Sequence, residues 1–211
     1  MEARLTVLHA DTTLLAFDKP AGLLCVPGRG ADKQDCLATR AQARWPDAMV
    51  VHRLDMATSG VVLMARGALA QRQLSIAFAQ HETEKTYVAV VHGQLADDTG
   101  EIDLPLAADW PNRPLQKVDR LHGKTSLTRY RVLQRDTATN TTRVELQPVT
   151  GRSHQLRVHL LALGHPILGD ALYAPPAVQA AAPRLLLHAQ SLKFAHPMTG
   201  ASTSIECEPP F

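Results

Sequence analysis

The chain has 211 residues, of which 45% are hydrophobic and 20% charged, as in an ordinary globular protein with room for one sizeable domain. Its formal net charge of +2 is too small to indicate a nucleic-acid partner unless the basic residues gather on one face. The three cysteines, the N-terminus and the apolar runs give no sign of a disulfide framework, a signal peptide or a membrane span, so we expect a cytoplasmic protein.

Short apolar runs alternate with turn residues in the first quarter of the chain. They predict strands at 5–9, 14–17 and 23–26. Asp35 is typical of a helix N-cap, and Leu37, Ala41 and Trp45 follow at four-residue spacing. We therefore expect a helix that begins after Asp35 and ends before Pro46.

The next stretch is a polar corner between two apolar runs. Residues 49–51 and 61–65 predict buried strands, and His52-Arg53-Leu54-Asp55 and Thr58-Ser59-Gly60 lie between them. A scaffold that presents an arginine and an aspartate on a connecting loop is a common way to build an active site. Aspartate, serine and glycine are also ordinary turn formers, so the residue types alone leave a plain turn as an equal alternative.

The middle of the chain predicts a helix, a strand and a long loop. Apolar residues recur at helical spacing across 67–82, and 86–92 is a strand with Tyr87 near its start. Segment 105–124 is polar and interrupted by prolines, so it cannot be a central strand. We expect a protruding loop whose basic residues are available to phosphates, among them Arg113, Lys117, Arg120, His122 and Lys124.

The last third is rich in predicted strands. Residues 127–134 and 142–147 predict a hairpin, and a helix with an apolar stripe of leucines follows Gly151 and ends at Gly164. Further strands are expected at 185–187, 192–194 and 203–207. Many strands and few helices predict one α+β domain with a mixed, mainly antiparallel sheet flanked by helices.

The polar corner also belongs to a recognisable motif. His52-Arg53-Leu54-Asp55 with Thr58-Ser59-Gly60 closely resembles the core motif of the RluA-type pseudouridine synthases. Other segments resemble that family's motifs in the same order and spacing: 18–22, 85–87, 150–159, 165–170 and 186–189. One such motif would be weak evidence, whereas several in register are specific.

The resemblance implies a single catalytic domain over residues 1–211, with a long bent sheet and a cleft across its middle. Some members of the family carry an N-terminal RNA-binding module of the S4 type. The first matching motif here begins at Asp18, so we expect no such module. The short length and the run Asp-Trp-Pro-Asn-Arg-Pro-Leu-Gln-Lys at 109–117 are most similar to a subgroup with two substrates. These substrates are a hairpin of 23S rRNA and the anticodon stem-loop of certain tRNAs.

The implied reaction breaks the bond between uracil N1 and C1′, turns the base and joins C5 to C1′. It needs neither electron transfer nor a group donor, so no cofactor is expected. The resemblance makes Asp55 the essential carboxylate, and a carboxylate could act as a nucleophile or as a base on the sugar. It also implies that Arg152 pairs with this aspartate and that Tyr87 packs against the uracil and takes the C5 proton.

A stacked uridine must be flipped out of the RNA before it can react. By resemblance Arg53 is the wedge that fills the gap. His52 is expected to be structural or to touch RNA, and Leu156 to line the uracil pocket or to belong to the core. The partner is therefore structured RNA, with no membrane and no protein partner implied.

Other site types fit the sequence poorly. His154 and His159 are five residues apart and miss the spacing of H-E-x-x-H, so no metal site is expected. No G-x-S-x-G is present, and the kinase His-Arg-Asp loop would need a different spacing. Two alternatives stay open: a relative that modifies a different single RNA, and an RNA-binding module without turnover.

Overall fold

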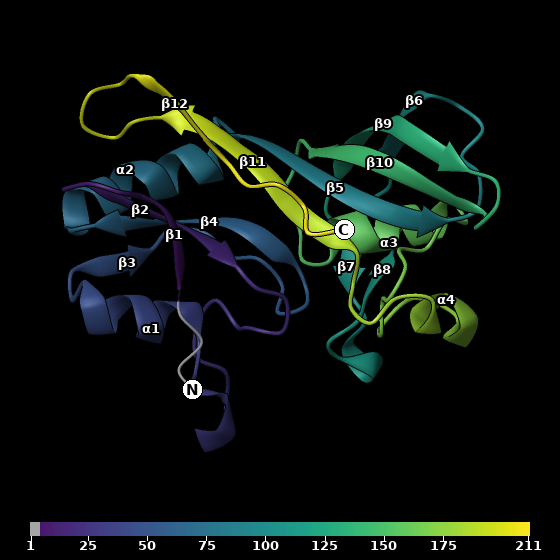
Figure 1. Cartoon of the computed structure of the whole chain (residues 1–211), viewed down its shortest axis with the longest axis horizontal. Coiled ribbons are helices and arrows are strands. Elements are labelled where there is room, and N and C mark those ends of the chain that lie inside the picture. Colours follow the sequence, from purple (N-terminus) through teal and green to yellow (C-terminus); the bar gives the residue numbers. More distant parts are fainter. Residues whose placement is uncertain (1–4) are drawn as a thin grey trace. The chain divides into compact units, whose positions relative to one another are not determined.

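The computed structural model describes residues 5–211 and divides the chain into two compact units (Figure 1). Unit one comprises the chain up to Lys85 together with Ala189–Pro210, and unit two comprises Thr86–His188 together with Phe211. Strands β5 (Glu84–His92) and β11 (Leu187–Ala195) contribute residues to both units. None of the helices in residues 5–211 combines the length and the apolar character that a membrane crossing requires.

Unit one is a sheet with the strand order β1-β2-β4-β11, in which β3 also pairs with β4 and β12 with β11. Its strands are β1 (Thr6–Ala10), β2 (Leu14–Lys19), β3 (Ala48–Val50), β4 (Ser59–Arg66) and β12 (Ser202–Glu206). Its helices are α1 (Leu37–Arg44), α2 (Ala68–Ala79) and the short 3-10 turn η1 (Ala31–Lys33).

Strand β4 is the centre of unit one. Every residue from Ser59 to Ala65 is buried, because both faces of this strand are covered. Alternate residues Val61, Leu63 and Ala65 pack with Ala70 and Leu74 of α2 in one apolar cluster. The polar corner before β4 is thereby attached to a strand that is buried along almost its whole length.

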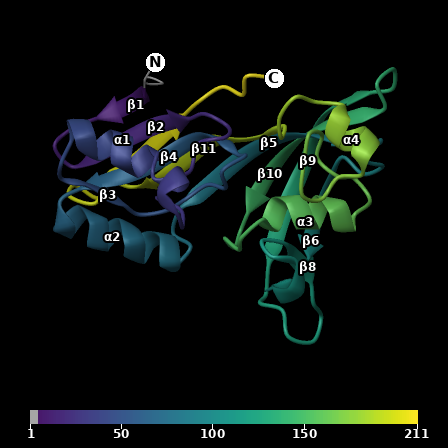
Figure 2. The same ribbon diagram turned by 90° about the horizontal axis from the view of Figure 1, so that it is seen from below.

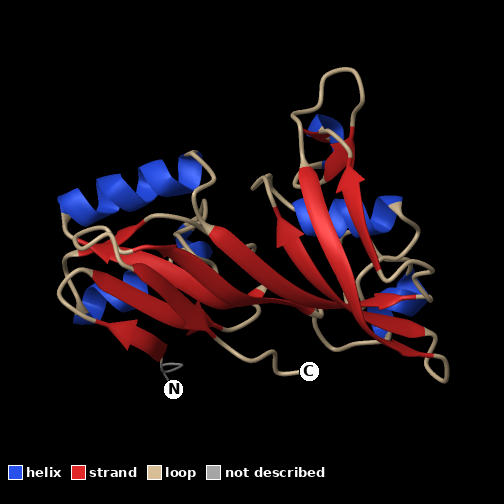
Figure 3. Cartoon of the chain, turned by 90° about the horizontal axis from the view of Figure 1, so that it is seen from above, coloured by secondary structure: helices blue, strands red, loops and turns tan. Residues whose placement is uncertain are grey.

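Unit two is built on the antiparallel order β5-β10-β9-β6, and Figure 3 shows its helices beside the strands. Its other elements are β6 (Thr99–Asp103), β7 (Leu106–Ala108), β8 (Gln116–Val118), β9 (Leu127–Asp136), β10 (Thr141–Pro148), α3 (Gln155–Ala162), α4 (Pro176–Ala180) and the 3-10 turn η2 (Trp110–Asn112). Helix α3 contacts β8, β9 and β10. The contacts with β9 and β10 place α3 against the sheet of unit two.

Several expected elements are confirmed. The mainly antiparallel α+β fold is as predicted, and so are the hairpin of β9 and β10 and helix α3. Gly164 follows α3 with φ +84°, and its amide donates to the Leu161 carbonyl while the His165 amide donates to that of Leu160. This is the Schellman arrangement that a glycine after a helix favours.

Other predictions were wrong. Residues 23–26 form no strand, since Leu24 makes only an isolated bridge with Cys36. Helix α1 has Cys36 as its N-cap, one residue after the predicted Asp35, whose carboxylate instead holds the Arg40 guanidinium through two contacts of 2.6 Å. The strands expected at 185–187 and 192–194 are largely one strand, β11.

Segment 105–124 is more ordered than a plain loop. It contains the antiparallel pair β7–β8 with η2 between the two strands, and Leu106 also bridges to Lys124. We call residues 105–124 the β7–β8 arm, which projects from the rest of unit two in Figure 2. Strands of three residues carry too short a pattern for a periodicity argument to find them.

Candidate functional site

Asp55 lies in the connection between β3 and β4 of unit one. Its neighbour Leu54 is buried and its amide donates to the Cys25 sulfur at 3.2 Å, whereas Asp55 is half-buried and Arg53 is exposed. The Thr58 amide then donates to the Asp55 carbonyl at 3.1 Å and closes a turn. The buried leucine thus anchors a short loop that keeps the side chains of Arg53 and Asp55 out of the core.

Lys19 fixes the other side of this loop. It has no exposed surface, and its ammonium donates to the carbonyls of Pro20, Leu23 and Met56 at 2.9, 2.7 and 3.1 Å. These three acceptors match the three donors of a lysine ammonium. Because Met56 follows Asp55 directly, Lys19 sets the path of the backbone beside the carboxylate.

His52 supports the entry to the loop. Its Nε2 accepts the Leu63 amide at 2.9 Å, and its ring stacks on Phe78 with centroids 4.4 Å apart. Burial lowers the pKa of His52 to about 3, and the nearby charge of Lys85 acts in the same direction. The imidazole is therefore neutral, with its proton on Nδ1, and it joins β4 to α2; its contact with RNA stays a prediction.

The last residue of the Thr-Ser-Gly segment, Gly60, lies where only a glycine fits. Its φ is +111°, and a Cβ at this position would lie 2.2 Å from the Ala189 carbonyl oxygen. A side chain would thus separate β4 from β11. Thr58 and Ser59 before it are buried, so this segment forms the packed base of the Asp55 loop.

In unit two, Tyr87 and Arg152 lie in different surroundings. Tyr87 is half-buried on β5, opposite Leu146 of β10. Arg152 is exposed before α3, and its Nε donates to the Thr125 carbonyl at 3.3 Å. A strand thus fixes the position of the tyrosine, whereas the segment that leads into α3 carries the arginine.

Gln155 holds the backbone of that segment, although the sequence reasoning did not single it out. Its Oε1 accepts the Arg152 amide at 3.0 Å and the Thr150 hydroxyl at 2.8 Å, and its Nε2 donates to the Leu127 carbonyl at 3.0 Å. A buried amide with so many partners determines where Arg152 emerges. The one feature of the sequence that could have indicated this role is that Gln155 lies within the segment 150–159, which matches a family motif.

Helix α3 turns its remaining matched residues inward. Leu156 is 6% exposed, which is the burial of a core residue, and its place in a uracil pocket stays a prediction. Arg157 and Asp170 form a buried pair with contacts of 2.8 and 2.6 Å. Asp170 also accepts the amides of Leu172 and Tyr173, so the pair fixes the chain that follows α3.

Arg113, Lys117 and Lys124 are all exposed on the β7–β8 arm. The arm is tied to α3 through Tyr173, whose hydroxyl accepts the Gln116 amide at 2.9 Å and lies 2.6 Å from Nδ1 of His154. The basic side chains are therefore presented on a hydrogen-bonded support.

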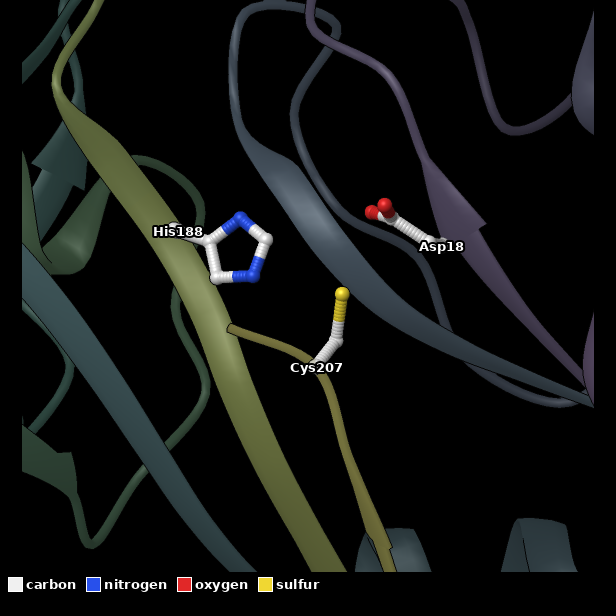
Figure 4. A group of neighbouring side chains, drawn as sticks. All are labelled: Asp18, His188 and Cys207. Carbon is white, nitrogen blue, oxygen red and sulfur yellow. The ribbon is translucent and has the colours of Figure 1, made fainter. Parts of the chain in front are cut away.

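Three side chains that could each ligate a metal ion are Asp18, His188 and Cys207, whose ligand atoms lie within 4.8 Å of one another (Figure 4). Burial raises the pKa of the Cys207 thiol to about 12, and the charge of Asp18 and its hydrogen bond with the thiol add to this effect. A thiol must lose its proton to bind a metal ion. Here the Cys207 thiol carries its proton and is hydrogen-bonded to Asp18.

Comparison with known proteins decides the family. Residues 13–162 match the family model of the RNA pseudouridylate synthases. The chain belongs to this family. Its members are isomerases that form pseudouridine in RNA, so the expected enzyme class and the RNA partner are confirmed.

The relatives match over nearly the whole chain. The dual-specificity RNA pseudouridine synthase RluA of Yersinia pestis is 53% identical over 205 residues, which cover 97% of this chain and 99% of the relative. The protein of the same name from Escherichia coli strain K12 is 50% identical over 210 residues, which cover 100% of this chain and 95% of the relative.

Solved structures agree on the fold. Human RNA pseudouridylate synthase domain containing 1 superposes with a TM-score of 0.82 at 27% identity, covering 99% of this chain and 84% of that one. Human RNA pseudouridylate synthase domain containing 4 superposes with a TM-score of 0.77 at 26% identity, covering 97% and 88%. The α+β fold of this chain is thus the fold of pseudouridine synthase domains.

Proposed function

We propose that this protein converts uridine to pseudouridine in two kinds of structured RNA, a hairpin of 23S rRNA and the anticodon stem-loop of tRNA. The strongest support is identity of 50 to 53% over nearly the full length with relatives that are named dual-specificity enzymes. The arm segment 109–117 supports the same subgroup. These substrates would place the protein in the cytoplasm, with residues 1–211 acting as one catalytic domain.

Asp55 is the carboxylate that acts at the sugar. The N1–C1′ bond breaks and the C5–C1′ bond forms, while C5 loses a proton and N1 gains one in the product. Asp55 either bonds to C1′ as a nucleophile or removes a proton from the sugar. The anchored loop supports both roles, because Leu54 and Lys19 hold the backbone on each side of the carboxylate.

The other proposed residues assist this carboxylate. Tyr87 packs against the uracil and takes the C5 proton, and Arg152 orients and stabilises the ionised aspartate. Arg53 enters the RNA where the uridine has left the stack. The exposure of its side chain, two residues before Asp55, supports this role.

The test is Asp55→Asn, which keeps the size of the side chain and removes its charge. We expect wild-type RNA affinity in filter binding and loss of pseudouridine, measured by chromatography of the nucleosides from digested RNA. Asp35→Asn, at an exposed carboxylate paired with Arg40, is the matched control and should keep full activity. Full activity of Asp55→Asn would remove this residue from the mechanism.

A further inference from the structure

The β7–β8 arm exposes a large aromatic side chain. Trp110 is 68% exposed, although tryptophan is among the residues that proteins bury most on average. The other tryptophan, Trp45, instead packs edge-on against Phe17 with centroids 5.8 Å apart. Trp110 therefore presents most of its ring surface to solvent.

Arg113 covers one face of this ring. Its guanidinium carbon lies 3.3 Å from the ring centroid of Trp110, a close cation–π stack. A ring that is covered on one side and is still 68% exposed has its opposite face in solvent. The guanidinium thus lies over the face of the indole, which differs from a side chain that extends to meet a phosphate.

Hydrogen bonds hold the turn that carries both residues. The Asn112 amide donates to the Asp109 carbonyl at 3.0 Å, and the Leu115 amide donates to the Asn112 carbonyl at 3.0 Å. The Asp109 amide donates to the Leu115 carbonyl at 2.9 Å, and the Asn112 side chain donates to the Asp109 carboxylate at 2.9 Å. The ring and the guanidinium are therefore presented by a preformed turn, which lowers the entropy lost on binding.

The chemistry of this surface fits a nucleobase. The flat face of a nucleobase stacks on aromatic side chains whatever the base, and arginine adds a cation–π contribution. Exposed Lys117 follows in the same arm and supplies a charge for the adjoining phosphate. Bases inside a double helix are stacked on each other, so the partner must be an unpaired base in a loop or a bulge.

We propose that Trp110 and Arg113 form a stacking platform for an unpaired base of the RNA substrate. This inference rests on the proposed function and adds a base contact at a distance along the chain from Asp55. It also gives Arg113 a role different from that of Lys117 and Lys124, because its guanidinium stacks. The platform would favour RNA with an open loop over a continuous duplex.

Fluorescence of Trp110 tests the proposal directly. A Trp45→Phe protein has Trp110 as its one tryptophan, and it is titrated with the tRNA anticodon stem-loop or with a fully paired duplex of equal length. We expect the stem-loop to quench the emission strongly and the duplex to leave it nearly unchanged. No change in emission at stem-loop concentrations that saturate binding by filter assay would overturn the platform.

Affinity gives a second test that does not depend on the Trp45 variant. Trp110→Ala should weaken binding of the stem-loop about tenfold, and Trp110→Phe should keep most of the affinity because it keeps a ring. Leu121→Ala is the control, at a side chain of the same arm that is 87% exposed. Equal affinity of the Trp110→Ala and Leu121→Ala proteins would contradict the proposal.

The amount of pseudouridine that the wild-type protein forms on the same stem-loop distinguishes failure of the stacking platform from failure of the proposed function. If the wild type forms pseudouridine while Trp110→Ala binds normally, the platform is wrong and the proposed function stands. If the stem-loop quenches Trp110 but no pseudouridine is formed, the platform is supported and the proposed substrate is wrong.

Discussion

Lys19 is a fully buried charge whose three donors are all used. Replacing it by methionine keeps most of the length of the side chain and leaves the carbonyls of Pro20, Leu23 and Met56 without this donor. We expect Lys19→Met to lower the free energy of unfolding by about 3 kcal/mol in urea. The rate of pseudouridine formation should also fall, since the backbone beside Asp55 loosens.

Lys33→Met is the control for this change, because Lys33 is exposed on the 3-10 turn η1. It should leave both stability and rate unchanged. If Lys19→Met were as stable and as active as this control, the carbonyl contacts of Lys19 would not organise the Asp55 loop.

His52 makes stability depend on pH. Its folded pKa of about 3 is below the ordinary 6.5, so the unfolded chain binds the proton more readily. The stability that depends on the neutral His52 is therefore fully present above pH 6.5 and is lost progressively as the pH falls towards 3. Between pH 7 and 5 the wild type should lose up to about 2 kcal/mol through this residue.

His52→Gln keeps an acceptor for the Leu63 amide but cannot titrate. Its unfolding free energy should fall less between pH 7 and 5 than that of the wild type, measured by urea unfolding at each pH. Parallel curves for the two proteins would show that His52 is not held neutral in the folded state.

At the scale of single residues, the sequence identified the motif but not the structural contacts that each of its residues makes. Asp55 and Arg152 could be named from their resemblance to a family pattern. The contacts of Lys19 with Met56 and of Gln155 with Arg152 could not, because they join backbone groups whose positions depend on the fold. His52 is the clearest example, since a histidine beside a candidate catalytic residue is here a neutral support.

At the scale of elements, the β7–β8 arm depends on Tyr173. Loss of its hydroxyl removes the acceptor for the Gln116 amide and the contact with His154. We expect Tyr173→Phe to raise the KM for RNA about fivefold, since one hydrogen bond contributes about 1 kcal/mol, and to leave kcat unchanged. Steady-state kinetics on the stem-loop measure both constants.

Tyr130→Phe is the matched control, because Tyr130 is a half-buried tyrosine of β9 in the same unit. It should keep the wild-type KM. A fall in kcat with unchanged KM in Tyr173→Phe would mean that Tyr173 does not act through the arm.

Elements with a long pattern were predicted, whereas several short ones were not. Helix α3 has a leucine stripe and a terminal glycine, and β9 and β10 are long enough to show alternation. Strands β7 and β8 have three residues each, and α4 has five, so their sequences carry little more than one period of their pattern. The strand expected at 23–26 was wrong because its residues make separate tertiary contacts. Leu24 forms an isolated bridge with Cys36, and the Cys25 sulfur accepts the Leu54 amide.

At the scale of the whole molecule, the net charge of +2 does not show that basic residues differ in their surroundings from one part of the chain to another. On β9, Arg129 pairs with Glu101 and Arg131 pairs with Glu145, at 2.8 Å in each case. The exposed lysines of the arm, Lys117 and Lys124, are the candidates for phosphate contacts.

Changing Lys117 and Lys124 together to alanine should weaken RNA binding and flatten its dependence on salt. Two lost phosphate contacts predict a slope of log K against log salt that is smaller by about 1.5. The double change of Arg129 and Arg131 to alanine is the control and should keep the wild-type slope. An unchanged slope in the lysine variant would show that these two lysines of the arm do not contact RNA phosphates.

Family and fold class could both be predicted because the motifs keep their order from Asp18 to His188. The mainly antiparallel sheet followed from strand-rich patterning. The catalytic motifs alone do not indicate which RNA is modified, because shape and unpaired bases select the substrate through surfaces such as the arm. That prediction came from the arm segment 109–117.

The most direct measurement is tritium release from C5-labelled uridine in two transcripts, the tRNA anticodon stem-loop and the 23S rRNA hairpin. Conversion to pseudouridine replaces the hydrogen at C5, so each turnover releases label into water. We predict release from both transcripts by the wild type and from neither by Asp55→Asn. Release from only one transcript would contradict dual specificity, and release by Asp55→Asn at the wild-type rate would contradict the central role of Asp55.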